Sequence, residues 1–360
     1  MKKRLLLIIF LLVLPLVLAL AFHLFYPQIP FRRGMGLSAS YMNRDILVEM
    51  HGLYKSIDVE EYVLGVLANA IPPDYEPETV RAQAVLIRTN VLREMEEKNT
   101  KDSADLSYDY LPKEDREKLW GKRNFNKWEA KFAQAVSTSA GMVVKSEGNL
   151  IIAAYHEVSI GKTVSAKEIL DEDVSYLQSV ESSHDVEAKN YMKLITYTYK
   201  EISNLLSEEK QVEEGVQTKD IGTGESDVAG DNMTESSVAE DSTGKSNVAE
   251  DGTGESGITD NNNRIAIIIE ESTDNGFVKK VSIDGKAYTG EEVMRMLELP
   301  SDNYYVEEIE GGIRFVCLGK GNCLGLSQYG ANVMALEGKS MEEMIAYYYK
   351  DVTIEKITNN

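Results

Sequence analysis

Residues 58–91 read DVEEYVLGVLANAIPPDYEPETVRAQAVLIRTNV, and this stretch predicts two consecutive helices. Asp58, followed three residues later by Glu61, has the form of a capping box, so the first helix is expected to run from Val59 to about Asn69. Pro77 suits the first position of the second helix. Apolar residues then recur three or four positions apart, as one face of a helix requires: Val80, Ala84, Ile87 and Val91.

The rest of the chain predicts an α+β fold, because strands and helices mix without a regular alternation. Strands are expected at 46–50, 53–57, 142–145, 150–155, 265–269, 277–283, 304–309, 313–318 and 352–357. Further helices are expected at 127–137, in a segment that ends at 205, and at 289–297, 327–338 and 340–349.

The N-terminus predicts a membrane anchor. Met1-Lys2-Lys3-Arg4 precedes an uncharged apolar run over 5–22, long enough to cross a bilayer. The basic cluster favours the cytoplasmic side, so we predict a single-pass cell-membrane protein with its ectodomain outside the cytoplasm. Residues 1–26 would be the signal-anchor and 27–38 a stalk. Ala19-Leu20-Ala21 leaves open a secreted form, cleaved near Ala21.

The charge is concentrated in one segment. The 360 residues contain 38 Lys+Arg and 59 Asp+Glu, a net charge of −21. This balance opposes the basic footprint of a nucleic-acid binder, so we expect no nucleic-acid partner. Residues 207–262 hold 15 acidic and 3 basic residues, which is −12 of the total.

Within 207–263 a decaying repeat of about ten residues replaces any core-forming pattern, as in Thr223-Gly224-Glu225-Ser226 and Thr243-Gly244-Lys245-Ser246. Low hydrophobicity and like charge predict a disordered acidic insert. The alternative is a calcium-binding repeat, which needs carboxylates at fixed positions, whereas these drift between copies.

Three motifs occur in chain order, and together they carry a resemblance. They are EEYVLGVLANAIP at 60–72 with Ala82-Gln83-Ala84-Val85 and Arg88-Thr89, YHEVSIGKT at 155–163 with YLQSV at 176–180, and GKGNCLGLSQYGA at 319–331. The chain resembles the stage II sporulation protein D family (sporulation/amidase-enhancer domain). The resemblance places the first part of the family domain at 39–206 and the second part at 264–358. It implies one bilobed ectodomain interrupted by the acidic insert.

The resemblance implies a peptidoglycan lytic transglycosylase that acts on glycan strands without stem peptides, during engulfment of the forespore. The family's catalytic Glu lies two residues before the proline of the first motif, where this chain has Ala70. Such an enzyme needs a carboxyl group that first donates and then accepts a proton, and a methyl group does neither. Asp74 is the substitute acid that we consider.

The same resemblance implies a set of glycan-binding residues: Gln83, Arg88, His156, Ser159, Gly161, Thr163, Ser327, Gln328 and Tyr329. For His156 and Ser159 the alternative is a structural turn. Gln83 and Arg88 lie five residues apart on one helix, so one could face the cleft while the other pairs with a carboxylate. Trp120, Trp128 and residues 347–349 could stack on sugars or belong to the core.

We predict no metal site and no cofactor. Some family members bind zinc through Cys and His near the second motif, where this chain has Ser159 and Lys162. Cys317 and Cys323 could form a disulfide outside the cytoplasm. A nucleophilic pair of Cys323 with His156 is a further alternative.

Three functional hypotheses follow. The first is a transglycosylase whose acid has moved to Asp74. The second is a non-catalytic protein that binds glycan or recruits cell-wall hydrolases, including other engulfment proteins, to the membrane. The third is a structural component of a membrane complex whose acidic insert docks on a basic partner. The absence of a carboxyl group at Ala70 favours the second.

Overall fold

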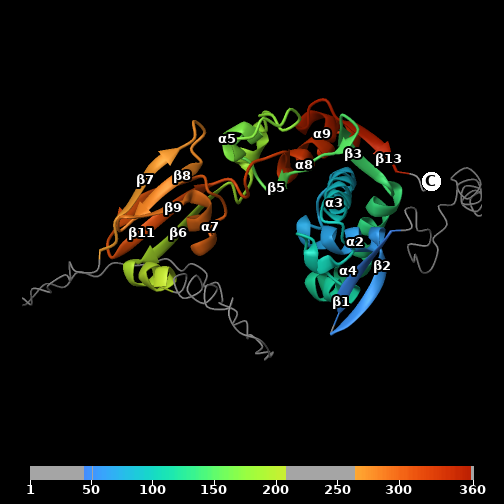
Figure 1. The fold of residues 1–360 in the computed structure, drawn as a ribbon, viewed down its shortest axis with the longest axis horizontal. Helices are drawn as coiled ribbons and strands as arrows, with labels where there is room; N and C mark the ends of the chain where they lie inside the picture. The colour runs from blue at the N-terminus through green and yellow to red at the C-terminus, as the bar shows by residue number, and fades with distance from the viewer. Residues whose placement is uncertain (1–43, 51, 208–263, 358–360) are drawn as a thin grey trace, which may run out of the picture.

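The computed structural model describes residues 44–50, 52–207 and 264–357. Figure 1 shows two bodies, a helical body at one end and a sheet body at the other, joined by a middle region. The fold is α+β, as expected. The predicted anchor, the stalk and nearly all of the acidic insert lie outside the described residues. Within the described ranges, no helix has both the length and the apolarity to cross a bilayer.

The helical body contains the two helices predicted from residues 58–91. It begins with the hairpin β1 (Asp45–Met50) and β2 (Leu53–Asp58), followed by α2 (Val59–Ala70), α3 (Pro77–Glu97) and α4 (Lys113–Thr138). Asp58 caps α2 by accepting a hydrogen bond from the Glu60 N–H at 2.8 Å. The expected capping box does not form, because the Glu61 carboxylate accepts a bond from Arg116 on α4 instead.

Helix α4 is longer than the sequence predicts. A break at Gly121, with φ of 70°, divides it into two helical segments, and the expected helix at 127–137 is the second of them. Trp120, at the end of the first segment, packs against Phe132 with ring centroids 5.0 Å apart. The first segment lacks a repeating apolar face, and long-range contacts of Trp120 and Arg116 hold it in place.

The middle region joins chain segments from both sides of residues 208–263. Strand β3 (Met142–Ser146) pairs with β4 (Asn149–Leu150) and with β13 (Thr353–Lys356), both antiparallel. Strand β5 (Tyr155–His156) pairs in parallel with β12 (Leu326–Ser327). The helices α5 (Ala166–Leu170), α8 (Gln328–Leu336) and α9 (Met341–Tyr348) complete this region. The short helices η1 (Ser103–Asp105) and η2 (Ser183–Glu187) lie in loops.

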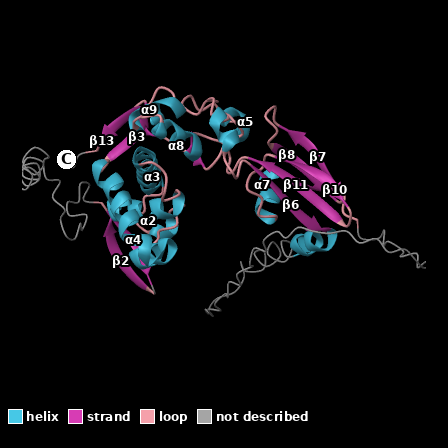
Figure 2. Ribbon diagram, turned by 180° about the vertical axis from the view of Figure 1, so that it is seen from behind, coloured by secondary structure: helices cyan, strands magenta, loops and turns pink. Residues whose placement is uncertain are grey.

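The sheet body is built from two three-stranded sheets and one helix. Strand β6 (Met192–Thr198) pairs with β11 (Gly312–Leu318), which pairs with β10 (Tyr304–Ile309). The second sheet contains β7 (Ile267–Ser272), β8 (Val278–Ile283) and β9 (Lys286–Thr289). Helix α7 (Gly290–Met296) starts with a capping box of Thr289 and Glu292 and lies beside the strands in both views, in contact with β8 and β9 (Figures 1 and 2). Helix is found at 199–207, but the residues before it form β6 rather than helix.

A buried ion pair fixes the helical body. Arg88 of α3 and Glu60 of α2 are both buried, and Nη2 donates to Oε2 at 2.5 Å while Nε donates to Oε1 at 2.9 Å. Arg88 Nη1 also donates to the carbonyl of Met142, and Glu60 Oε1 accepts from the Gly141 N–H at 3.0 Å. The pair therefore joins α2 and α3 to the start of β3.

Substitution Glu60→Gln should lower the free energy of unfolding by about 3–5 kcal/mol, because it leaves the Arg88 guanidinium buried without a counter-charge. Glu97→Gln is the matched control, since it breaks the exposed Arg93–Glu97 pair of α3 and should cost less than about 1 kcal/mol. Urea unfolding of both variants measures the difference. Equal costs would contradict a structural role for the buried pair.

Candidate functional site

The first and third motifs meet through one amide. Gln328, the first residue of α8, donates from Nε2 to the carbonyl oxygen of Ala70 at 2.6 Å and to Gln83 Oε1 at 3.2 Å. Both glutamines are buried. Because Ala70 ends α2 and Gln83 lies on α3, this contact places the start of α8 against both helices of the first motif.

The second and third motifs meet through their backbones. The Lys320 N–H donates to the Val158 carbonyl at 2.7 Å, and the Val158 N–H donates back to Lys320 at 3.2 Å. The Tyr329 N–H donates to the Glu157 carbonyl at 3.1 Å. Gly325 has φ of 65°, and a Cβ there would lie 2.0 Å from the Ala154 carbonyl oxygen, so this close approach requires glycine.

A pocket of about 310 Å³ opens where the three motifs converge. We call it the Ala70 pocket. Its apolar wall comes from the end of α2 and from α4, through Ala68, Ala70, Ile71, Pro72, Leu119 and Trp120. Its polar groups come from one residue of each motif: Asn69, Glu157 and Gln328. An apolar wall with a few hydrogen-bonding groups is the usual composition of a small-molecule site.

Glu157 is the charged residue among those that line the Ala70 pocket. Its Oε2 lies 2.5 Å from Lys320 Nζ, and its Oε1 accepts a bond from Asn190 Nδ2 at 2.5 Å. The carboxylate is therefore held by two donors from other segments. Glu157 belongs to the second motif, but its place in the pocket could not be predicted from the sequence, because neither donor is near it in the chain.

The sequence can now be compared with those of known proteins. A model of the family described as "Stage II sporulation protein" matches residues 49–145. The sequence is 26% identical over 310 residues to Stage II sporulation protein D of Bacillus amyloliquefaciens, covering 84% of this chain and 75% of that protein. The protein of the same name from Bacillus subtilis is also 26% identical over 310 residues, covering 84% and 76%. The chain belongs to the stage II sporulation protein D family.

A relative outside Bacillus extends the comparison. An uncharacterized protein of Brachyspira hyodysenteriae is 23% identical over 302 residues, covering 83% of this chain and 67% of that protein. The match to the family model ends at residue 145, so it contains the first motif, whereas the Bacillus alignments cover most of the chain. The expected membership of the family is confirmed, and the chain is a sporulation protein of this family.

The structure places most of the glycan-binding residues that the family resemblance implies inside the protein. Of the nine, Gln328 lines the Ala70 pocket directly. Tyr329 and Gly161 are partly exposed. The others are buried: Gln83, Arg88, His156, Ser159, Thr163 and Ser327. Their partners explain why, since Arg88 pairs with Glu60 and the Ser159 N–H donates to Asp185. These side chains hold the walls of the site, and direct contact with glycan stays a prediction.

The substitute acid considered from the sequence lies outside the Ala70 pocket. Asp74 is exposed in the turn between α2 and α3 and does not line that pocket. Trp120 lines it but is buried against Phe132, and its Nε1 has no partner among the described residues. No group of three or more His, Cys, Asp or Glu residues that could hold a metal occurs in the described ranges.

The two cysteines do not form the disulfide that was considered. Both are free and buried, Cys317 in the core of the sheet body and Cys323 in the core of the middle region. Burial raises the pKa of Cys317 to about 11 and that of Cys323 to about 12. A nucleophilic cysteine needs a lowered pKa, so the burial of Cys323 argues against the Cys323–His156 alternative.

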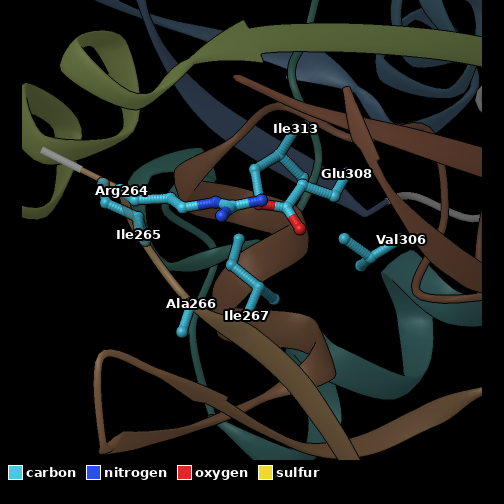
Figure 3. Close-up of a pocket in the computed structure, with 7 residues that line it drawn as sticks. All are labelled: Arg264, Ile265, Ala266, Ile267, Val306, Glu308 and Ile313. Atoms are coloured by element: carbon cyan, nitrogen blue, oxygen red, sulfur yellow. The ribbon is translucent and has the colours of Figure 1, made fainter. Parts of the chain in front are cut away.

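A separate pocket of about 370 Å³ lies in the sheet body (Figure 3). Ile265, Ile267 and Ile313 form an apolar floor, and Arg264 forms an ion pair with Glu308 at its edge. Tyr199 also donates to Glu308 at 2.9 Å. No residue of the three motifs lines this pocket.

His156 is a neutral structural residue of the site. Its Nδ1 lies 3.0 Å from the Leu324 carbonyl oxygen, which can only accept, so Nδ1 carries the proton. Nε2 has no partner among the described residues. Burial lowers the pKa of His156 to about 4, although the bond to Leu324 and the nearby Asp185 carboxylate favour the charged form.

This pKa predicts a loss of stability in acid. An unfolded chain protonates His156 near its ordinary pKa of about 6.5, whereas the folded chain does so only near 4, so stability falls as the pH falls from 6.5 towards 4. The contribution should be about 2 kcal/mol between pH 7 and pH 5. His156→Asn keeps a donor for Leu324 but does not titrate, so its stability should vary less over this range. Identical pH profiles of unfolding would contradict the assignment.

Proposed function

We propose that this chain binds peptidoglycan glycan strands in the Ala70 pocket, from a membrane-anchored position outside the cytoplasm, without cleaving them. The observation that carries this proposal is that the three family motifs converge on one pocket. In this pocket the end of α2 presents the methyl group of Ala70. Asn69, Gln328 and Glu157 supply hydrogen-bonding groups for sugar hydroxyls, and Leu119 and the prolines supply apolar contact.

The chemistry of the pocket supports binding over cleavage. Lytic cleavage needs a proton donor at the glycosidic oxygen, and the side chain of Ala70 has none to give. Glu157 is the carboxylate that lines the pocket, but both of its oxygens accept bonds, from Lys320 and from Asn190. A carboxylate that accepts at both oxygens serves better as an acceptor for sugar hydroxyls than as an acid.

The hypothesis of a relocated acid receives less support. A transglycosylase with its acid at Asp74 would need the glycosidic oxygen to reach an exposed turn outside the Ala70 pocket. A recruiter of cell-wall hydrolases is compatible with binding, because a glycan strand held without cleavage can be presented to a separate enzyme. Anchoring through residues 1–26 belongs to the same proposal and rests on the sequence.

The test uses the full chain in detergent with glycan strands stripped of stem peptides. The wild type should sediment with the strands and produce no 1,6-anhydro-muramyl ends by mass spectrometry. Ala70→Glu should produce such ends, because it returns a carboxyl group to the end of α2. Asp74→Asn should behave as the wild type.

Two results would overturn the proposal. Anhydro ends from the wild type that disappear in Asp74→Asn would make the chain a transglycosylase with a relocated acid. Failure of the folded wild type to sediment with glycan strands would remove the binding function itself.

A further inference from the structure

A second cavity, of about 400 Å³, lies farther along α8 from the Ala70 pocket. We call it the Tyr347 pocket. Residues of η2, α8, α9 and the segment before η2 line it, among them Glu181, His184, Gly330, Met334, Glu337 and Tyr347. Gln328, at the start of α8, belongs to the Ala70 pocket, so the two cavities use different parts of one helix.

The wall of the Tyr347 pocket combines an aromatic ring, a thioether and carboxylates. The ring of Tyr347 is 38% exposed, and its hydroxyl donates to the Glu181 carbonyl at 2.8 Å, which fixes the ring against the segment before η2. Met334 is a flexible apolar neighbour of the kind that adapts to alkyl chains. Such a wall favours a ligand with an apolar stem.

The carboxylates of this pocket lack strong counter-charges. Glu337 lies 4.0 Å from His184, and neither Glu337 nor Glu181 forms an ion pair with a lysine or arginine in the part of the chain that the structure describes. Lys339 lines the pocket but pairs with Glu343 of α9 at 3.2 Å. The Lys350 ammonium lies 6.0 Å from the Tyr347 ring centroid, at the limit of a cation–π contact.

The floor of the Tyr347 pocket adds an independent sign of negative potential. A Cβ on Gly330 would lie 2.3 Å from Ser182 Oγ, 2.3 Å from the Tyr348 hydroxyl and 3.0 Å from Asp185 Oδ1. Asp185 is fully buried, and this Oδ1 has no partner among the described residues. Asp185 does not line the cavity itself, and its other oxygen accepts the Ser159 N–H at 2.7 Å. A buried carboxylate oxygen without a donor therefore lies directly behind the glycine that lines the cavity.

We propose that the Tyr347 pocket binds a primary ammonium group on an aliphatic chain, as in a lysine or other diamino-acid side chain of a peptide. The methylenes lie against Tyr347 and Met334, and the ammonium lies between the carboxylates of Glu181 and Glu337. An ammonium beside an aromatic face and carboxylates is a favourable arrangement for a cation. This site is separate from the glycan pocket and does not depend on it.

The test measures binding of Nα-acetyl-lysine amide to the full chain in detergent, by saturation-transfer NMR and titration. The neutral analogue, Nα,Nε-diacetyl-lysine amide, has the same stem and should give no saturable binding. Glu181→Gln and Glu337→Gln should each raise the Kd about threefold to fivefold, as loss of one exposed charge contact does. Glu342→Gln is the matched control, since this residue of α9 pairs with Arg81 and does not line the pocket. It should leave the Kd unchanged.

Three results would overturn the proposal. One is equal binding of the neutral analogue, which would mean that the ammonium is not recognised. Another is an unchanged Kd in the double variant Glu181→Gln/Glu337→Gln. The third is no saturable binding of the lysine amide by the folded wild type. Each of these results can be interpreted even if the chain does not bind glycan, because the test measures binding of the lysine amide alone.

Discussion

The buried pair of Arg88 and Glu60 is the constraint on which the helical body depends. A guanidinium and a carboxylate that are both removed from water need hydrogen-bond partners within the protein. Here the two groups bond each other, and they also bond the backbone at Met142 and Gly141. Helices α2 and α3 are thereby fixed relative to β3. The end of α2, and with it Ala70, takes its position from this arrangement.

The candidate site follows from that position. Gln328 can bond the Ala70 carbonyl and Gln83 together only because α2 and α3 are held at a fixed separation. Most of the polar motif residues then act inside the protein rather than on a ligand. The pocket thus does not depend on the side chain at position 70, because the hydrogen bond from Gln328 goes to the Ala70 backbone carbonyl. This is the physical reason for which we propose binding without cleavage.

Much of the fold could be predicted from local signals, but the site could be predicted only in part. The helices of residues 58–91, the helices expected at 289–297 and 340–349, and the strands β10 and β11 depend on neighbours in the chain, and they formed as expected. Glu61 was misjudged because Arg116, 55 residues away, takes its carboxylate. Glu157 was missed for the same kind of reason, since Lys320 and Asn190 position it from a distance.

The central claim is that glycan occupies the Ala70 pocket. The most direct test measures glycan binding by two variants, each with one leucine replaced by alanine. Leu119 lines the pocket and is 55% exposed, whereas Leu336, at the end of α8, is 66% exposed and lies outside the pocket. Sedimentation of the full chain with stem-peptide-free glycan strands should show an affinity about fivefold lower for Leu119→Ala, from the loss of roughly 1 kcal/mol of apolar contact, and no change for Leu336→Ala. Equal affinities for the two variants would contradict the account.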